Sequence, residues 1–335
     1  MKSQSEAEEP DSKFSDIDEY GFKRSENFDV KIYQKFMSSY INVLARRRVK
    51  WDYLIRTGID YVNINSQLKR FIRKGIPAPY RPDVWMKTSG AHNLKKNSPN
   101  LYQNLLRGHY EKEIGDSILI DLPRTFPDNI YFETKKTKLF NVLMAYAHHN
   151  REVGYCQGLN YIAGLLMIVT DDEETTFWLL KIVVEHICPE YHTKNMANLL
   201  RDLAVFKRLV TRRYPEINRK FEQLSLPYAV IASKWFICVF AEVLPVETVL
   251  RIWDCVFAEG YKILFRVALA LILTHKTAII KCEEISAAAN LFRVEMPIDE
   301  IATNCHTFME TVFQIKLKRS ELESLRKQCV GITST

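Results

Sequence analysis

The stretch that decides the fold of this chain is Ile118-Leu119-Ile120-Asp121-Leu122-Pro123-Arg124-Thr125-Phe126-Pro127. A predicted amphipathic helix, Glu113–Asp121, delivers the chain to it. Pro123 and Pro127 each fix their own φ and disfavour helical geometry at the preceding residue. We therefore expect Arg124 to stand on a stiff turn that loses little entropy when the arginine engages a partner.

A second stretch lies downstream and reads Gly154-Tyr155-Cys156-Gln157-Gly158-Leu159-Asn160. Gln157 stands between Gly154 and Gly158, residues that let a backbone bend or be approached closely. An apolar run, Leu159–Val169, follows and predicts a helix. The second stretch therefore presents an amide side chain at the start of a helix.

An arginine and a glutamine presented in this way suit the hydrolysis of GTP. The guanidinium can stabilise charge on phosphoryl oxygens, and the amide can orient the attacking water. An arginine supplied by a partner protein is worth about 10³–10⁵ in rate. The residue types alone favour ordinary roles, because Asp121 and Arg124 are spaced as a helix-end ion pair and Gln157 could be a satisfied core amide.

The order of several motifs favours a role in GTP hydrolysis over these ordinary roles. Ile118-x-x-Asp121-x-x-Arg124 and Tyr155-Cys156-Gln157-Gly158 resemble the paired finger motifs of the TBC family, the GTPase-activating proteins for Rab GTPases. Further landmarks follow that family's order: Lys74-Gly75-Ile76-Pro77, Arg81-x-x-x-Trp85, Ser233-Lys234-Trp235-Phe236 and Arg251-Ile252-Trp253-Asp254. The resemblance covers residues 70 to 275. The flanks, including Tyr20-Gly21-Phe22 and Pro245-Val246-Glu247-Thr248, resemble one small vertebrate member of the family.

The resemblance implies an all-α, multi-helix fold of two lobes and a GTPase-activating protein for a Rab. Arg124 would be an arginine finger and Gln157 a glutamine finger, both supplied in trans. The residues implied to support them are Asp121, Tyr155 and Gly158, and the structural signature is Arg81, Trp85, Trp253 and Asp254. GTP and magnesium would come with the Rab, since this chain has no GxxxxGK[ST] loop and is not expected to be an NTPase or to need a metal or cofactor. Pro123 occupies a position at which the family varies and could alter the approach of Arg124.

Two other functions compete with this interpretation. One is a helical Rab-binding scaffold that keeps the fold but activates no GTPase efficiently; the presence of both finger residues argues against it. The other is a thiol hydrolase, which is suggested by His148 and His149 close in sequence to Cys156. That chemistry requires a low-pKa thiol and a third orienting group, and nothing nearby in the sequence supplies either.

Composition limits the remaining classes. With 335 residues, 47% of them hydrophobic, the chain can bury one large core or two lobes that share an interface. The net charge of +7 arises from 47 basic residues spread among 40 acidic ones, so the field typical of nucleic-acid binding is absent. His186, Cys188 and His192 match no common zinc spacing. The seven cysteines form no CxxC pair and suggest reduced thiols.

The chain is predicted to have four regions. They are a disordered tail at 1–28, an N-terminal helical extension at 29–67, the TBC domain at 68–280 and C-terminal helices at 281–335. In the extension, Arg46-Arg47-Arg48 and Lys50 are expected to form a solvated helix face. The segment Tyr228–Val243 is expected to be one central helix. The longest apolar run, Ala163–Val169, is too short to span a bilayer, so we expect a cytoplasmic protein that meets membranes at most peripherally, through the Rab, with its oligomeric state open.

Overall fold

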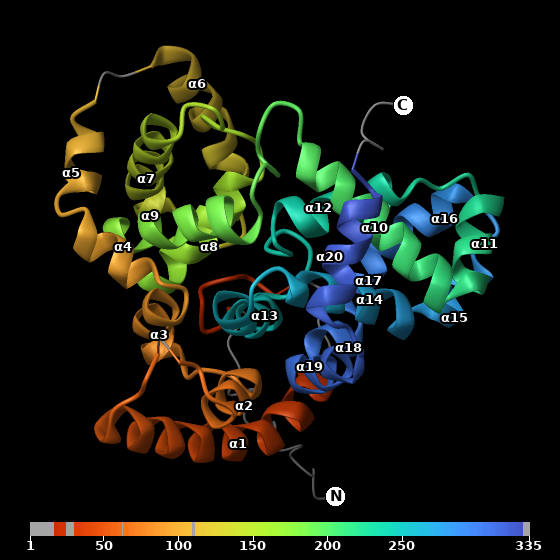
Figure 1. Ribbon diagram of the computed structural model, residues 1–335. Coiled ribbons are helices and arrows are strands. Elements are labelled where there is room, and N and C mark those ends of the chain that lie inside the picture. Colours follow the sequence, from red (N-terminus) through yellow and green to blue (C-terminus); the bar gives the residue numbers. More distant parts are fainter. Residues whose placement is uncertain (1–16, 25–29, 62, 109–110, 331–335) are drawn as a thin grey trace, which may run out of the picture.

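The computed structural model describes residues 17–24, 30–61, 63–108 and 111–330. Helices joined by turns make up these ranges, in which β-pairing is confined to two isolated bridges, Ile17–Lys23 and Phe22–Asn129. The predicted all-α fold with two lobes is confirmed (Figure 1).

The first lobe contains the helices that lead into both finger stretches. Its helices are α3 (Arg81–Thr88), α4 (Ala91–Asn97), α5 (Leu101–Leu106), α6 (Lys112–Asp121), α7 (Lys136–His149), α8 (Leu159–Thr170) and α9 (Glu173–Ile182). The helices α5, α6, α8 and α9 all pack against α7. The ends of α6 and α8 thereby become part of one packed unit.

The second lobe follows in sequence and lies on the other side of the molecule in Figure 1. It contains α10 (Ala197–Arg213), α11 (Pro215–Gln223), α12 (Tyr228–Ile237), α14 (Lys262–Thr274), α15 (Lys276–Lys281), α16 (Ile285–Asn290), α17 (Met296–Ile298), α18 (Glu300–Thr303), α19 (Cys305–Gln314) and α20 (Arg319–Gln328). The sequence patterns did not predict the short helices α15 to α18.

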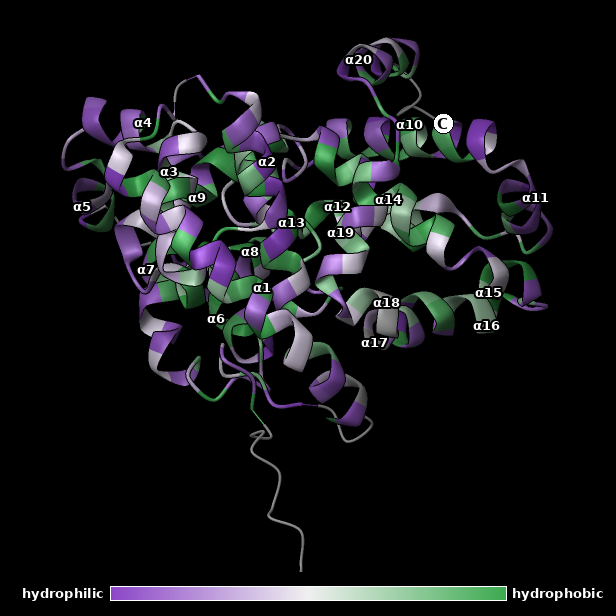
Figure 2. Cartoon of the chain, turned by 90° about the horizontal axis from the view of Figure 1, so that it is seen from below, coloured by the Kyte–Doolittle hydropathy of each residue, from purple (hydrophilic) through white to green (hydrophobic). Residues whose placement is uncertain are grey.

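Helix α13 (Val246–Glu259) lies between the lobes and contacts α2 (Ser66–Lys74), α3, α14 and α19. Helix α1 (Val30–Thr57) runs along one edge of the molecule (Figure 1). Hydrophobic residues concentrate in interior helices such as α8 and α14, whereas α4 and α20 are largely hydrophilic (Figure 2). Burial of the apolar helices holds the two lobes together.

The signature residues meet at one buried carboxylate. Asp254 is fully buried and accepts hydrogen bonds from Arg81 Nε at 3.2 Å and from Trp85 Nε1 at 2.9 Å. The backbone N–H of Ile76 donates to its other oxygen at 2.9 Å. Trp253 is also buried. The signature therefore joins α3 to α13, and Arg81 and Trp85 share one carboxylate partner.

The predicted single helix over residues 228–243 is wrong, because α12 ends at Ile237. Val239 and Phe240 follow in the left-handed region, with φ of +48° and +65°. Trp253 Nε1 donates to the Val239 carbonyl at 2.9 Å, which stabilises this turn. Neither residue type signals a left-handed turn, so the apolar pattern concealed the break.

The prediction of a disordered tail is wrong for residues 17–24. Residues 1–16 and 25–28 of that tail lie outside the described part, but residues 17–24 pack against the first lobe and α13. In α1, Arg46, Arg48 and Lys50 are exposed as predicted. Arg47 is instead buried and donates to the Tyr40 hydroxyl at 3.2 Å, so it does not belong to the solvated face.

Candidate functional site

The arginine stretch forms a tight turn at the end of α6. A 3₁₀ turn, Leu122–Arg124, continues directly from the helix. Leu122 has helical angles, φ −56° and ψ −47°, so the expectation that Pro123 would keep it out of helical geometry is wrong. The 3₁₀ turn accepts a proline in its first positions, where the missing N–H is not needed. Phe126 does leave helical geometry, with φ of +50°.

Arg124 is held at its base while its side chain remains 59% exposed. Its Nη2 donates to Asp121 Oδ1 at 2.7 Å, which is the predicted helix-end ion pair. Its Nε donates to the Ile120 carbonyl at 3.2 Å. These two bonds fix the direction of the guanidinium and leave donors available to a partner.

Asp121 connects the two stretches. Its side chain is only 9% exposed, and its second oxygen accepts a hydrogen bond from Tyr155 Oη at 2.6 Å. Burial, followed by the bond to Asp121, raises the pKa of Tyr155, so the phenol stays protonated as the donor. One buried carboxylate thus orients Arg124 and anchors the loop that carries Gln157.

A second bridge, which the sequence analysis missed, runs through Asn160. Thr125 Oγ1 donates to the Asp121 carbonyl and accepts from Asn160 Nδ2, both at 2.8 Å. Asn160 Oδ1 accepts from the Gly158 N–H at 3.0 Å. Thr125 and Asn160 are both buried. An asparagine in the second position of a mostly apolar helix was the available signal for this bridge.

Gln157 is exposed, and its side chain makes no hydrogen bond to any other described residue. The core-amide interpretation is therefore wrong. Gly158 has φ of +109°, a conformation that L side chains rarely adopt, so the backbone supports the predicted need for glycine. Gly154 also adopts a positive φ, +57°. The two glycines allow the loop to project the amide outward.

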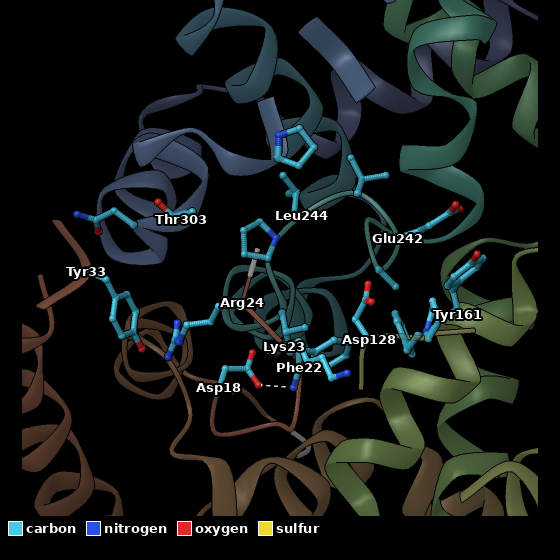
Figure 3. A pocket seen from close by; sticks show the side chains of 18 of the residues that line it. Asp18, Phe22, Lys23, Arg24, Tyr33, Asp128, Tyr161, Glu242, Leu244 and Thr303 are labelled. Carbon is cyan, nitrogen blue, oxygen red and sulfur yellow. Dashed lines mark hydrogen bonds between the residues drawn. The ribbon is translucent and has the colours of Figure 1, made fainter. Parts of the chain in front are cut away.

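Arg124 is one of the residues that line a groove of about 1280 Å³. Figure 3 shows this groove with Asp128 and Tyr161 in its wall. Phe126, Pro127 and Tyr161 line it together with the arginine. Further lining residues come from α1, from the 241–246 segment, from 17–24 and from the 297–304 region. Tyr161 Oη donates to the Arg124 carbonyl at 3.3 Å. The guanidinium therefore stands at the margin of a broad concave surface, where a protein partner can reach it.

The surroundings of Cys156 do not provide the chemistry that a thiol hydrolase needs. Burial, with a smaller contribution from Asp121, raises the pKa of Cys156, which opposes formation of a thiolate. His148 Nδ1 lies 2.9 Å from the Leu105 carbonyl, and His149 Nε2 lies 3.2 Å from Glu185 Oε1. Both histidines are thus engaged away from the thiol.

Two of the three residues weighed for zinc, Cys188 and His192, also have other surroundings. Cys188 is buried, and His192 Nε2 lies 2.9 Å from the Ile237 carbonyl. Within the ranges that the structure describes, no cluster of three His, Cys, Asp or Glu side chains could hold a metal ion. None of the described helices is both long and apolar enough to cross a membrane.

The Rab-GTPase-TBC domain family model matches residues 78–280. The chain belongs to the TBC family. This TBC protein is 43% identical over 320 residues to growth hormone-regulated TBC protein 1-A of Danio rerio, with 93% of this chain and 89% of that protein covered. It is 42% identical to growth hormone-regulated TBC protein 1 of Homo sapiens, with 93% and 94% covered.

A solved structure agrees with these relatives. The Chlamydomonas flagellar RabGAP TBC domain is 30% identical, with a TM-score of 0.78 over 89% of this TBC protein and 99% of that chain. The predicted family is thereby confirmed. The boundaries predicted at residues 68 and 280 stay predictions.

Proposed function

We propose that this TBC protein is a GTPase-activating protein for a Rab GTPase and supplies both Arg124 and Gln157 in trans. One observation carries the proposal: two exposed side chains project from loops that hydrogen bonds of the buried Asp121 and Asn160 join into one unit. Such a unit can present both groups to a bound nucleotide without reorganisation during the reaction. The relative described as a flagellar RabGAP supports the same activity.

Each side chain has a distinct role in the proposal. The Arg124 fork neutralises charge that develops on the transferred phosphoryl oxygens as the terminal P–O bond breaks. The Gln157 amide orients the water that attacks phosphorus and takes the place of the GTPase's own glutamine. Asp121 and Tyr155 are positioning residues: Asp121 contacts Arg124, and Tyr155, in the loop that carries Gln157, contacts Asp121. The Rab brings GTP and magnesium, so the chain needs no cofactor of its own.

The competing proposal is a Rab-binding scaffold without efficient activation. In both cases we propose a cytoplasmic protein that reaches membranes through its Rab. The two differ in what Arg124→Lys does. Lysine keeps the charge but loses the bidentate fork, so an activating protein loses most of its rate while a scaffold binds as before.

Single-turnover phosphate release from a panel of GTP-loaded Rab proteins tests the proposal. Wild type, Arg124→Ala and Gln157→Ala are compared on every Rab. We expect wild type to accelerate one or a few Rabs and both variants to lose that acceleration. Binding of a Rab by folded wild type, with no acceleration across the panel, would favour the scaffold.

A further inference from the structure

Residues 17–24 form a compact turn in a region whose composition predicts a loose tail. The Asp18 carboxylate accepts hydrogen bonds from the N–H groups of Tyr20 and Phe22, at 2.9 and 2.8 Å. The Asp18 N–H donates to the Phe22 carbonyl at 2.8 Å. Gly21 provides the positive φ, +91°, that the turn requires. The segment is therefore a structured unit and not an extended strand.

This turn pairs with the loop that follows Arg124. The Lys23 N–H donates to the Asp128 carbonyl, and the Ile130 N–H donates to the Gly21 carbonyl, both at 2.9 Å. Asn129 Nδ2 donates to the Tyr20 carbonyl, also at 2.9 Å. Three hydrogen bonds thus join residues 20–23 to residues 128–130.

Phe22 adds an apolar contact closer to the arginine. Its ring packs edge to face against Phe126, with centroids 5.3 Å apart and an interplanar angle of 84°. Phe126 lies two residues beyond Arg124 in a left-handed conformation, which persists only where surrounding contacts hold it. Figure 3 shows Phe22 beside Asp128 in the wall of the groove.

The other side of the turn is fixed to the core. The Tyr20 hydroxyl donates to Glu247 Oε2 at 2.6 Å and accepts from Arg81 Nη1 at 2.8 Å. Burial alone would raise the pKa of Glu247, but the charge and hydrogen bonds of Arg81 outweigh it and lower that pKa. The carboxylate is therefore ionised, and the turn extends from the partly buried ion pair of Glu247 and Arg81 to the finger loop.

We propose that residues 17–24 are a positioning clamp that holds the 126–130 loop and thereby fixes the place of Arg124. The expected effect of the clamp on the activation rate rests on the proposed function, whereas its hold on the 126–130 loop does not. It leaves the guanidinium available, because the described hydrogen bonds of Arg124 go to Ile120 and Asp121 and none goes to the clamp. This separates it from an inhibitory strap, which would cover the finger.

Phe22→Ala tests the clamp because it removes the ring contact and keeps the backbone bonds. We expect the activation rate at saturating TBC protein to fall about 10- to 100-fold, since a displacement of the order of 1 Å costs about 100-fold in rate. The concentration for half-saturation should change less than about threefold, because Phe22 is one of many residues that line the groove and the others are unchanged. Phe22→Tyr, which retains the ring, should restore the rate.

A second readout does not depend on activity. Hydrogen exchange of the amides in residues 122–132 should become faster in Phe22→Ala and stay at the wild-type rate in Phe22→Tyr. Val230→Ala is the control, because Val230 is 67% exposed on α12 and does not line the groove. If Phe22→Ala lowers the melting temperature substantially, Phe22→Leu is measured in its place, because leucine keeps most of the apolar volume but removes the ring.

Where wild type does accelerate a Rab, each remaining result overturns the clamp. Unchanged exchange would mean that the segment does not hold the loop. A higher activation rate would identify an inhibitory strap, and a weaker half-saturation with an unchanged maximal rate would place Phe22 in the Rab contact. If wild type accelerates no Rab, the proposed function fails, and hydrogen exchange alone decides whether the segment holds the loop.

Discussion

Tyr155→Phe removes one hydroxyl and tests whether the two finger loops work as a unit. The bond that it breaks is 2.6 Å long and ends on Asp121, whose side chain is only 9% exposed. A hydrogen bond to a charged group contributes about 1.5–3 kcal/mol. We therefore expect the free energy of unfolding to fall by about this amount. For a chain of this length that lowers the melting temperature by roughly 2–4 °C.

The same free energy limits the effect on catalysis. If all of it is needed to return Arg124 to its position, the activation rate at saturation falls by up to about 10- to 160-fold, because about 1.4 kcal/mol corresponds to a factor of ten. In the Arg124→Ala background, Tyr155→Phe should cost the same stability but little further rate, since the finger is already absent.

Single-turnover phosphate release and thermal unfolding measure these two effects. Tyr102→Phe is the matched control, because Tyr102 donates to the Glu173 carboxylate at 2.5 Å elsewhere in the first lobe. It should lower stability without lowering the maximal activation rate. A destabilised Tyr155→Phe with full activation rate would refute the reasoning, as would an equal rate loss in the presence and absence of Arg124.

Three further outcomes follow from the geometry. Arg124→Lys should lose about 10³-fold or more of the activation rate while Rab binding, measured by titration, stays close to wild type; retention of the rate would contradict a bidentate role. Gly164→Val should cost about 1–3 kcal/mol in urea unfolding and lower the activation rate more than Rab affinity, because a Cβ there would lie 3.0 Å from Thr125 Cγ2 in the finger turn; a wild-type rate would show that the turn tolerates the added volume. Burial alone would raise the pKa of Glu185, but hydrogen bonds from His149 and Lys181 outweigh it and lower the pKa from 4.5 to about 2. The stability that Glu185 contributes is therefore present above pH 4.5 and lost as the pH falls toward 2, so Glu185→Gln should flatten that part of the stability profile, and an unchanged slope would contradict the shift.

The turns of the two finger stretches could be predicted from the sequence because their signals are local. The prolines after Asp121 and the glycines around Gln157 mark turns, and the structure places turns there. Their connection through Tyr155 was not visible in the spacing, because it depends on how α6 and α8 pack on α7. The resemblance to the TBC family therefore supplied the pairing that local patterns could not.

Two other features could not be predicted from the sequence, because contacts between distant parts of the chain determine them. The polar composition of residues 1–28 concealed a turn whose stability comes from partners more than 100 residues away, such as Asn129 and Glu247. The break after Ile237 uses Val239 and Phe240 in left-handed geometry, without the glycine that usually marks such a turn. Long-range partners determine both features, and composition and periodicity do not report them.

The most direct test of the dual-finger proposal uses a Rab whose own catalytic glutamine is replaced by alanine. Such a Rab lacks the residue that normally orients the attacking water. If Gln157 supplies the amide in trans, wild-type protein will still accelerate single-turnover phosphate release from this Rab, and Gln157→Ala will not. Loss of acceleration by wild-type protein, with Rab binding intact, would contradict the proposed role of Gln157.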